Sequence, residues 1–282
     1  MNVDPADARQ LGSLLRRHRI ELQHRLGQNF LVEVSLRDSI ADAAGLDAGD
    51  EVLEVGAGVG TLTVALAARC KKVVAVELDG RLLPALREVL EGHHNVQVVQ
   101  ADILRFDIVS AFPNGGEVVA GNIPYNLTGE LMRRLLDRPP RPRKLSLVVQ
   151  KEVADRWTAT TGASLATVAV QMFSEPRIVM SVPAESFTPV PKVDSALVVL
   201  DVRPEPAVNV DDADRFLRFV EAVFQFRRKQ LGGTVGRITK TSGSESASAL
   251  NALGIDPTRR PQTLSLGEWE IVFRAFNTRF DR

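Results

Sequence analysis

The sequence is short of the residues that build disulfides, metal centres and membrane spans. It contains one cysteine, Cys70, and four histidines among 282 residues. A lone cysteine cannot form an internal disulfide and scattered histidines do not form a multi-histidine centre, so we expect a reducing compartment and no structural metal. No apolar run approaches the roughly 18 residues of a membrane span, and the N-terminus lacks the apolar core of a signal peptide. These absences predict a cytoplasmic protein that does not enter a membrane.

Net charge is absent as well, because 35 Lys and Arg residues balance 35 Asp and Glu residues. The basic residues are nevertheless segregated. Residues 9–25 carry five arginines against one glutamate, residues 133–144 carry six basic side chains against one aspartate, and residues 225–240 carry five with no acid. Such segregation is typical of nucleic-acid binding, although solvated helix faces and loops produce the same pattern.

Between residues 30 and 200, short apolar runs alternate with segments of helical periodicity. Several runs are rich in valine and nearly continuous, as in strands that are covered on both faces. The alternation predicts an α/β fold with a doubly wound, mostly parallel sheet. We expect strands at residues 51–55, 72–77, 96–100, 118–121, 144–150, 166–173 and 196–202, and helices at residues 35–44, 61–68, 81–90 and 128–136.

Past the last predicted strand the pattern changes. Residues 203–211 contain two prolines and indicate a linker. Beyond it, five apolar residues fall on one face of an amphipathic helix: Phe216, Phe219, Val220, Val223 and Phe224. We expect the serine-rich residues 242–248 to form a loop before a further helix. The chain therefore divides into a basic extension at residues 1–23, an α/β domain at residues 24–203 and a small helical domain at residues 204–282.

Glycine and polar residues recur where successive predicted strands end. The first strand is followed by a turn that contains three glycines, which let the backbone bend beside a helix N-terminus: Gly56, Gly58 and Gly60. Glu77, Asp102 and Asn122 follow the next three strands. A doubly wound sheet binds ligands at this edge, and a carboxylate such as that of Glu77 suits a ribose diol. Each residue alone could cap a loop, but together they predict a ligand site.

The tetrapeptide after the fourth strand, Asn122-Ile123-Pro124-Tyr125, matches the N-[PIL]-P-[YF] pattern of methyltransferases that act on an exocyclic amine of a nucleobase. An adenine amine is a poor nucleophile because its lone pair is delocalised into the ring. The side-chain oxygen of Asn122 and the carbonyl of Ile123 could accept its two hydrogens and draw the nitrogen toward tetrahedral geometry. Tyr125, the only tyrosine, would stack on a flipped base. The alternative is a proline turn with a buried tyrosine.

From near residue 24 to residue 275, the chain resembles the ribosomal RNA adenine dimethyltransferase family. The most family-specific strings are Gly-Gln-Asn-Phe-Leu at residues 27–31 and Phe-Thr-Pro-Val-Pro-Lys-Val-Asp-Ser at residues 187–195. Further matches are the glycine turn, residues 122–126, residues 149–156, residues 226–229, and Ile255-Asp256-Pro257 with Arg260 and Leu264-Ser265.

The resemblance implies a Rossmann-like methyltransferase fold, with a mostly parallel seven-stranded sheet and a small C-terminal all-helical domain that binds RNA. It implies S-adenosylmethionine as the cofactor, held by Gln28, Asn29, Leu31, Gly56, Gly58, Glu77, Asp102 and Asn122. The implied catalytic set is Asn122, Tyr125 and Phe187, with Phe187 closing over the flipped base opposite Tyr125. The expected RNA contacts are Arg133, Arg134, Arg227, Arg228 and Lys229.

The implied activity is dimethylation of the 6-amino groups of two adjacent adenosines in the 3′-terminal hairpin of 16S rRNA, late in small-subunit assembly, by a monomer. Two alternatives stay open. One is the macrolide-resistance relative that methylates large-subunit rRNA, which the tail motifs disfavour. The other is a non-catalytic ribosome-assembly or transcription factor, which the intact tetrapeptide disfavours. A nicotinamide dehydrogenase would need a third glycine where Thr61 stands.

Overall fold

The computed structural model describes residues 3–22, 28–124, 127–137 and 139–280. The chain divides into two compact units, the first formed by Met1–Ala154 with Pro176–Val202 and the second by Asp155–Glu175 with Arg203–Arg282. Within the described residues, no helix is long and apolar enough to cross a membrane.

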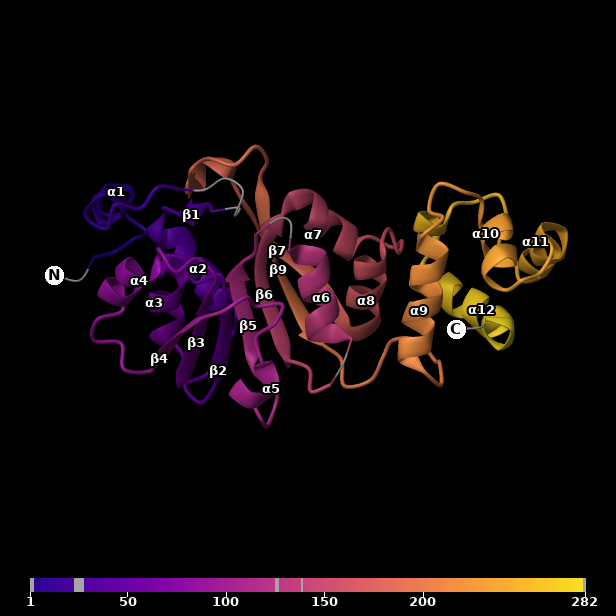
Figure 1. The fold of residues 1–282 in the computed structure, drawn as a ribbon, viewed down its shortest axis with the longest axis horizontal. Coiled ribbons are helices and arrows are strands. Elements are labelled where there is room, and N and C mark those ends of the chain that lie inside the picture. The colour runs from indigo at the N-terminus through magenta and orange to yellow at the C-terminus, as the bar shows by residue number, and fades with distance from the viewer. Residues whose placement is uncertain (1–2, 23–27, 125–126, 138, 281–282) are drawn as a thin grey trace. The chain divides into compact units, whose positions relative to one another are not determined.

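A seven-stranded sheet forms the centre of the first unit (Figure 1). Its strand order is β4-β3-β2-β5-β6-β9-β7, and the strands span Val96–Gln100, Lys72–Glu77, Glu51–Val55, Val118–Asn122, Lys144–Gln150, Ser195–Val202 and Ser174–Val182 respectively. The pairs from β4 to β6 are parallel, and β9 runs antiparallel to β6. The predicted doubly wound, mostly parallel sheet is confirmed.

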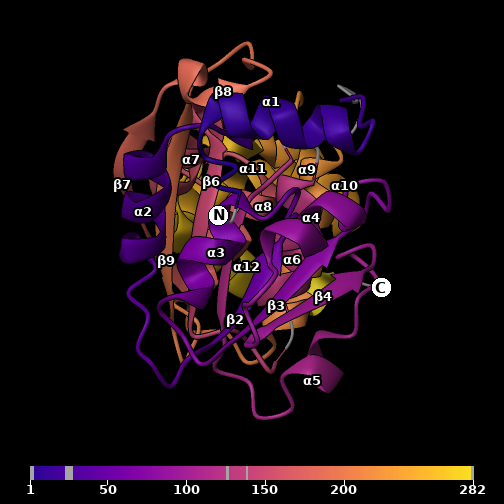
Figure 2. The same ribbon diagram turned by 90° about the vertical axis from the view of Figure 1, so that its left-hand side faces the viewer.

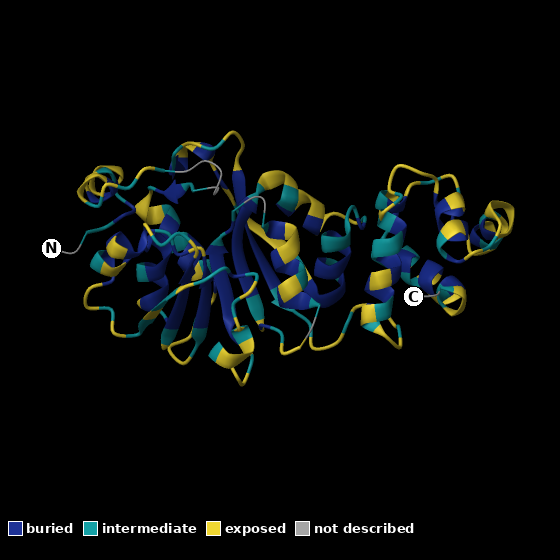
Figure 3. Ribbon diagram, viewed as in Figure 1, coloured by how far each residue is buried: buried dark blue, intermediate teal, exposed yellow. Residues whose placement is uncertain are grey.

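Burial explains why these strands could be predicted from the sequence. The residues of β2, β3, β5 and β6 are buried almost throughout, and Figure 3 shows the central strands dark blue along most of their length. Helices flank the sheet: α2 (Val34–Ala43), α3 (Thr61–Ala67), α4 (Leu83–Val89), α5 (Ile108–Ala111) and α6 (Thr128–Leu136). Strands covered on both faces are continuous apolar runs, so strand and helix boundaries followed the predicted ones within a few residues.

The basic N-terminal extension contains a helix of the first unit, α1 (Ala8–Arg17), whose first turn is capped by Asp7. Its buried residues Leu11, Leu14 and Leu15 form a cluster with Leu82, which directly precedes α4, and with Val89, the last residue of α4. Figures 1 and 2 both show α1 beside α4. A spacing of three and four residues puts the leucines on one face and leaves the arginines to solvent.

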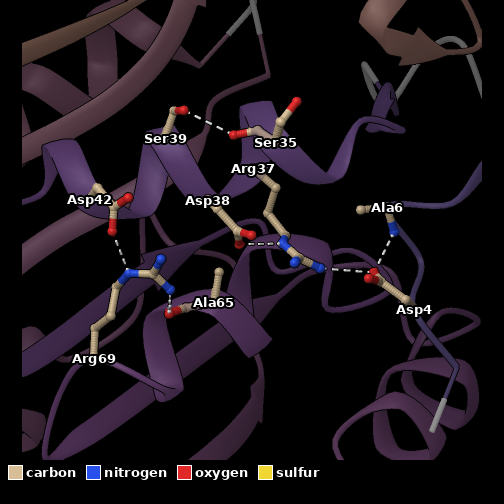
Figure 4. Close-up of polar contacts among 9 residues, drawn as sticks. All are labelled: Asp4, Ala6, Ser35, Arg37, Asp38, Ser39, Asp42, Ala65 and Arg69. Carbon is tan, nitrogen blue, oxygen red and sulfur yellow. Dashed lines mark hydrogen bonds and ion pairs between the residues drawn. The ribbon is translucent and has the colours of Figure 1, made fainter. Parts of the chain in front are cut away.

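Two ion pairs anchor this extension at its ends. Arg37 on α2 donates to the Asp4 carboxylate at 2.8 Å and to Asp38 at 2.9 Å (Figure 4). At the other end, Glu88 on α4 accepts from Arg17 and contacts the His18 ring at 2.6 Å. The extension is therefore built into the first unit by both apolar and polar contacts.

The second unit is helical. It contains α8 (Leu165–Phe173), α9 (Ala213–Phe224), α10 (Leu231–Ile238), α11 (Gly243–Ala252) and α12 (Leu266–Phe276), and α7 (Lys151–Thr158) spans the boundary between the units. The predicted apolar face of α9 is buried. The rings of Phe216 and Phe219 meet the Phe273 ring edge-on, with centroids 5.3 and 5.5 Å apart. The C-terminal helical region is confirmed.

The strand predicted at residues 166–173 is wrong, because this segment is α8. Seven of the nine residues in its sequence, LATVAVQMF, are apolar, so the pattern did not separate a buried helix from a buried strand. Ser164 begins the helix by accepting a hydrogen bond from the Thr167 amide. The strand follows as β7, and α8 packs with α9 and α12 in the second unit. Residues 155–175 thus lie with the helical unit, whereas the sequence pattern grouped them with the α/β domain.

The serine-rich residues 242–248 were predicted to form a loop, and this is also wrong. Ser242 is the N-cap of α11 and accepts from the Glu245 amide at 3.1 Å. Inside the helix, the buried Ser246 hydroxyl donates to the Gly232 carbonyl of α10 at 2.7 Å. Serines disfavour helix interiors in isolation, but this one satisfies a backbone carbonyl across a close helix contact.

Candidate active site

A cavity of about 180 Å³ opens in the first unit where β2, β3, β4 and β5 end. Because these strands are parallel, their carboxyl ends meet at one edge of the sheet. The cavity is lined by all eight residues that the family resemblance assigned to a cofactor: Gln28, Asn29, Leu31, Gly56, Gly58, Glu77, Asp102 and Asn122. Residues far apart in the sequence thus converge on one space.

The glycine turn forms one wall of this cavity. Gly58 has a φ of +60°, and a side chain there would bring its first carbon to 3.0 Å from the Phe30 ring. Gly56, with a φ of +73°, donates its amide to the Val76 carbonyl at 2.9 Å. Both backbone conformations favour glycine over other residues. The contact with Phe30 also joins the Gly-Gln-Asn-Phe-Leu string to the glycine turn.

Glu77, at the end of β3, is buried and accepts two backbone hydrogen bonds. One carboxylate oxygen accepts from the Gly58 amide at 2.8 Å and the other from the Asp79 amide at 2.7 Å. Burial raises the pKa of Glu77, and these two amide donors oppose that rise. Each carboxylate oxygen can accept a further bond, so two acceptors remain for a diol.

Gln28 and Asp102 occupy the sides of the cavity. Gln28 donates to the Asp79 carboxylate at 2.7 Å, and the pKa of Asp79 is lowered to about 2, first by its hydrogen bond with Arg81. Asp102 follows β4 and accepts from the Leu104 amide at 3.0 Å. Its second carboxylate oxygen lies 3.9 Å from Arg105, at the limit of an ion pair.

Asn122 ends β5, and its side-chain amide nitrogen donates to the Asn29 carbonyl at 2.8 Å. A carbonyl can only accept, so this contact assigns the nitrogen of the amide to the Asn29 side. The oxygen of the Asn122 amide is then directed elsewhere, as an acceptor. The following residue, Ile123, is buried and donates its amide to the Val148 carbonyl on β6 at 3.0 Å.

Comparison with known proteins decides the family. Residues 19–277 match a family model described as ribosomal RNA adenine dimethylase. The chain belongs to this family. The predicted enzyme class, an S-adenosylmethionine-dependent rRNA adenine dimethyltransferase, is therefore confirmed, and so is the cofactor.

Members of the dimethylase family and their structures resemble the chain over nearly its whole length. It is 43% identical over 288 residues to Ribosomal RNA small subunit methyltransferase A of Pelotomaculum thermopropionicum, covering 97% of both chains. It is 36% identical to the protein of the same name from Geobacillus thermodenitrificans, covering 98% of both. Among solved structures, the 23S rRNA methyltransferase ErmE matches with a TM-score of 0.69 at 32% identity, covering 88% of this chain and 100% of that one. A dimethyladenosine transferase from Plasmodium falciparum matches with a TM-score of 0.68 at 26% identity, covering 87% and 96%.

The cavity of this dimethylase fits S-adenosylmethionine, and one residue that supports this was missed in the sequence. Glu54 is fully buried in the cavity wall, and one of its carboxyl oxygens has no hydrogen-bond partner among the described residues. Burial, together with the charge of Glu77, raises its pKa to about 7. An orphaned buried carboxyl suits the ammonium group of the cofactor's methionine. Its only signal in the sequence was its place two residues before Gly56.

Leu78 and Ile103 were also missed. Each follows one of the predicted acidic residues, Glu77 or Asp102, and both line the cavity. The Leu78 side chain is 54% exposed although it is large and apolar. Apolar side chains beside the groups expected to bind ribose and adenine suit a flat aromatic ring, which strengthens the fit to the cofactor.

The catalytic set is described only in part. Phe187 lines the same cavity and is 2% exposed, so it is both a cavity wall and a member of the core cluster. Asn122 and Pro124, from the tetrapeptide that follows β5, also line the cavity. Tyr125 lies outside the described residues, so its predicted stacking role stays a prediction.

The predicted RNA contacts fall in both units. Arg133 on α6 pairs with Asp137 at 3.2 Å, and Arg134 donates to the Phe106 carbonyl. The three others, Arg227, Arg228 and Lys229, are exposed in the turn that follows α9. The two arginines of α6 are thus engaged within the fold, whereas the triplet after α9 is presented to solvent.

Proposed function

We propose that this dimethylase transfers methyl groups to the 6-amino groups of two adjacent adenosines in the 3′-terminal hairpin of 16S rRNA, two methyl groups to each base. The observation that carries the chemistry is the Asn29–Asn122 hydrogen bond, which directs the amide oxygen of Asn122 away from Asn29 as an acceptor. The choice of the small subunit is supported by relatives of that name, at 43% and 36% identity over nearly full length.

Residues of the cavity hold the cofactor in this proposal. Glu77 accepts the ribose hydroxyls, Asp102 accepts from the adenine amine, and Glu54 pairs with the ammonium group. When bound, S-adenosylmethionine supplies a methyl group that its positive sulfur makes electrophilic. Gly56 and Gly58 keep the backbone free of side chains where the cofactor approaches.

Asn122 acts on the nucleophile. Its amide oxygen and the Ile123 carbonyl accept the two amine hydrogens, which localises the nitrogen lone pair toward the methyl group. No general base is required, because the amine proton becomes acidic only after methylation places positive charge on the nitrogen, and water can then remove it. Tyr125 and Phe187 would stack on the flipped adenine from opposite sides.

The remaining expectations belong to the same proposal. The exposed triplet of Arg227, Arg228 and Lys229 contacts rRNA phosphates, which makes the helical unit an RNA-binding domain. The enzyme acts as a monomer, in the cytoplasm, on a late intermediate of the small subunit.

The second candidate is methylation of large-subunit rRNA, which the similarity to ErmE at 32% identity favours. One experiment separates the two. Labelled methyl groups are transferred to small and large ribosomal subunits that lack the modifications, and the labelled adenosines are mapped. We expect label on two adjacent adenosines of the small subunit, with Asn122→Ala as the inactive control; label confined to the large subunit would refute the proposal.

A further inference from the structure

A two-stranded sheet stands apart from the main sheet and joins two segments of the site. β1 (Phe30–Leu31) pairs antiparallel with β8 (Phe187–Thr188), with Phe30 opposite Thr188 and Leu31 opposite Phe187. The Val32 amide extends the ladder by donating to the Ser186 carbonyl at 2.8 Å. Two residue pairs are too few to be stable alone, so other contacts must hold these strands together.

A side-chain hydrogen bond provides such a contact. The hydroxyl of Ser186 donates to the Glu33 carboxylate at 3.0 Å, between positions 153 residues apart. Ser186 is 7% exposed, and bonds to a carboxylate are stronger than neutral ones. Glu33 occupies the N-cap of α2 but makes no capping bond with its side chain. Its carboxylate reaches across to the β8 segment instead.

The β8 segment is held at its other side as well. The Ala184 amide donates to the Asp194 carboxylate at 3.0 Å, and the Ser186 amide donates to the Pro183 carbonyl at 3.1 Å. Residues 184–188 are therefore tethered both to the chain that follows them and to Glu33. Phe187 lies within this tethered segment.

The two strands belong to different halves of the proposed site. Leu31 on β1 and Asn29 just before it line the cavity, and the Asn29 carbonyl accepts a hydrogen bond from the Asn122 side chain. On β8 stands Phe187, the aromatic expected on the base. We call residues 28–31 the cofactor wall and Phe187 the base wall. The β1–β8 ladder and the Glu33–Ser186 bond connect these two walls.

We propose that Glu33 and Ser186 are positioning residues that couple the two walls, so that cofactor held against residues 28–31 sets Phe187 in place for the target adenine. The inference rests on the proposed assignment of Phe187 and of the cofactor wall. Coupling of this kind is reciprocal: cofactor and RNA raise each other's affinity by the same factor.

The chain offers a matched control. The Ser35 hydroxyl donates to the other oxygen of the same carboxylate at 3.1 Å, but Ser35 lies on α2 and is exposed. Ser35→Ala and Ser186→Ala therefore remove the same kind of bond from the same acceptor. Only Ser186→Ala removes the side-chain bond between Glu33 and the β8 segment.

The test measures binding rather than turnover. The probes are S-adenosylhomocysteine and a small-subunit rRNA hairpin with 2-aminopurine at the target adenosine, whose fluorescence reports flipping. RNA affinity is measured with and without S-adenosylhomocysteine for wild type and each variant. For wild type we expect S-adenosylhomocysteine to raise RNA affinity on the order of 10-fold. In Ser186→Ala the ratio should fall toward one, with affinity for S-adenosylhomocysteine alone unchanged, whereas Ser35→Ala should keep the wild-type ratio.

Further variants keep the test decisive if Ser186→Ala does not fold. Glu33→Ala should also abolish the coupling, and Glu33→Gln, which keeps an acceptor oxygen, should retain most of it. Equal coupling in Ser186→Ala and wild type, equal loss in Ser35→Ala, or no coupling in an active wild-type enzyme would each overturn the inference. Absence of methyl transfer by wild type to either subunit would instead refute the proposed function.

Discussion

The side-chain amide of Asn122 donates to the backbone carbonyl of Asn29 across 93 positions of sequence, at 2.8 Å. The bond joins the end of β5, where the tetrapeptide begins, to the segment before β1, and both residues line the cavity. It distinguishes the nitrogen of the Asn122 side-chain amide from the oxygen, which has nearly the same size and position. One hydrogen bond thus decides which way the amide oxygen of Asn122 is directed.

Asn122→Asp tests this relationship, because aspartate has nearly the same shape but cannot donate to the Asn29 carbonyl. We expect methyl transfer to fall as far as in Asn122→Ala, while RNA affinity changes little. Single-turnover rates and RNA binding measured on the same preparations check this. An Asn122→Asp enzyme with near wild-type rate would show that donation to Asn29 is not needed.

Glu54 predicts a pH dependence of cofactor binding. Burial raises its pKa to about 7 in the protein, so the carboxyl is mostly protonated below that pH and mostly ionised above it. Only the ionised form pairs with the ammonium group, so cofactor affinity should weaken as pH falls through about 7. Calorimetry across pH 6 to 8, which brackets the value, measures this. Glu54→Gln should bind with an affinity that no longer varies over this range; the same pH dependence in this variant would assign the titration to another group.

The same group has an effect on stability in the absence of cofactor. A carboxyl whose pKa is raised by folding destabilises the folded protein when it must ionise, above the raised pKa, and this cost disappears as pH falls toward the ordinary value near 4.5. Glu54→Gln should therefore melt at a higher temperature than wild type above pH 7 and show less difference below it.

Glu77→Ala should weaken cofactor binding and also destabilise the first unit. The variant loses two charge-assisted hydrogen bonds to the ribose, each of roughly 1.5–3 kcal/mol, and leaves the Gly58 and Asp79 amides without an acceptor. Calorimetry and thermal unfolding are therefore measured together, and Asp102→Ala serves as the comparison for stability alone, because Asp102, which accepts from the Leu104 amide, is less buried than Glu77. An unchanged dissociation constant in a folded Glu77→Ala protein would remove Glu77 from the site.

The exposed basic triplet predicts a salt effect on RNA binding. Replacing Arg227, Arg228 and Lys229 with glutamine should flatten the dependence of log affinity on log salt by about 0.7–0.9 for each phosphate that is no longer neutralised. Cofactor affinity should not change. Arg133→Gln with Arg134→Gln is measured beside it; these two arginines, also expected to contact RNA, already contact Asp137 and the Phe106 carbonyl, so we expect a smaller change in the salt dependence. Parallel salt plots for wild type and the triplet variant would exclude these residues from the RNA interface.

Much of the fold and site was predictable because the relevant signals are local. The strands β2, β3, β5 and β6 are mostly apolar runs because they are buried, and the residues predicted to bind the cofactor line a cavity where parallel strands end. The error at α8 has the opposite origin. A short segment that is mostly apolar fits a buried helix or a buried strand equally well, and the cap by Ser164 and packing against α9 and α12 decided between them.

By itself, the sequence determined the α/β order, the glycine turn, the amine-methylating tetrapeptide and the family, because each depends on neighbouring residues or on fixed spacing. Tertiary structure alone decided the contacts between distant residues. It directed the amide of Asn122 through Asn29, and it buried Glu54 in the cavity wall with one carboxyl oxygen that no described residue contacts. It also packed Leu14 of the basic extension into a buried cluster and joined Glu33 to Ser186. A side chain's hydrogen-bond partner and its burial depend on which segments fold beside it, and no local pattern in the chain encodes that.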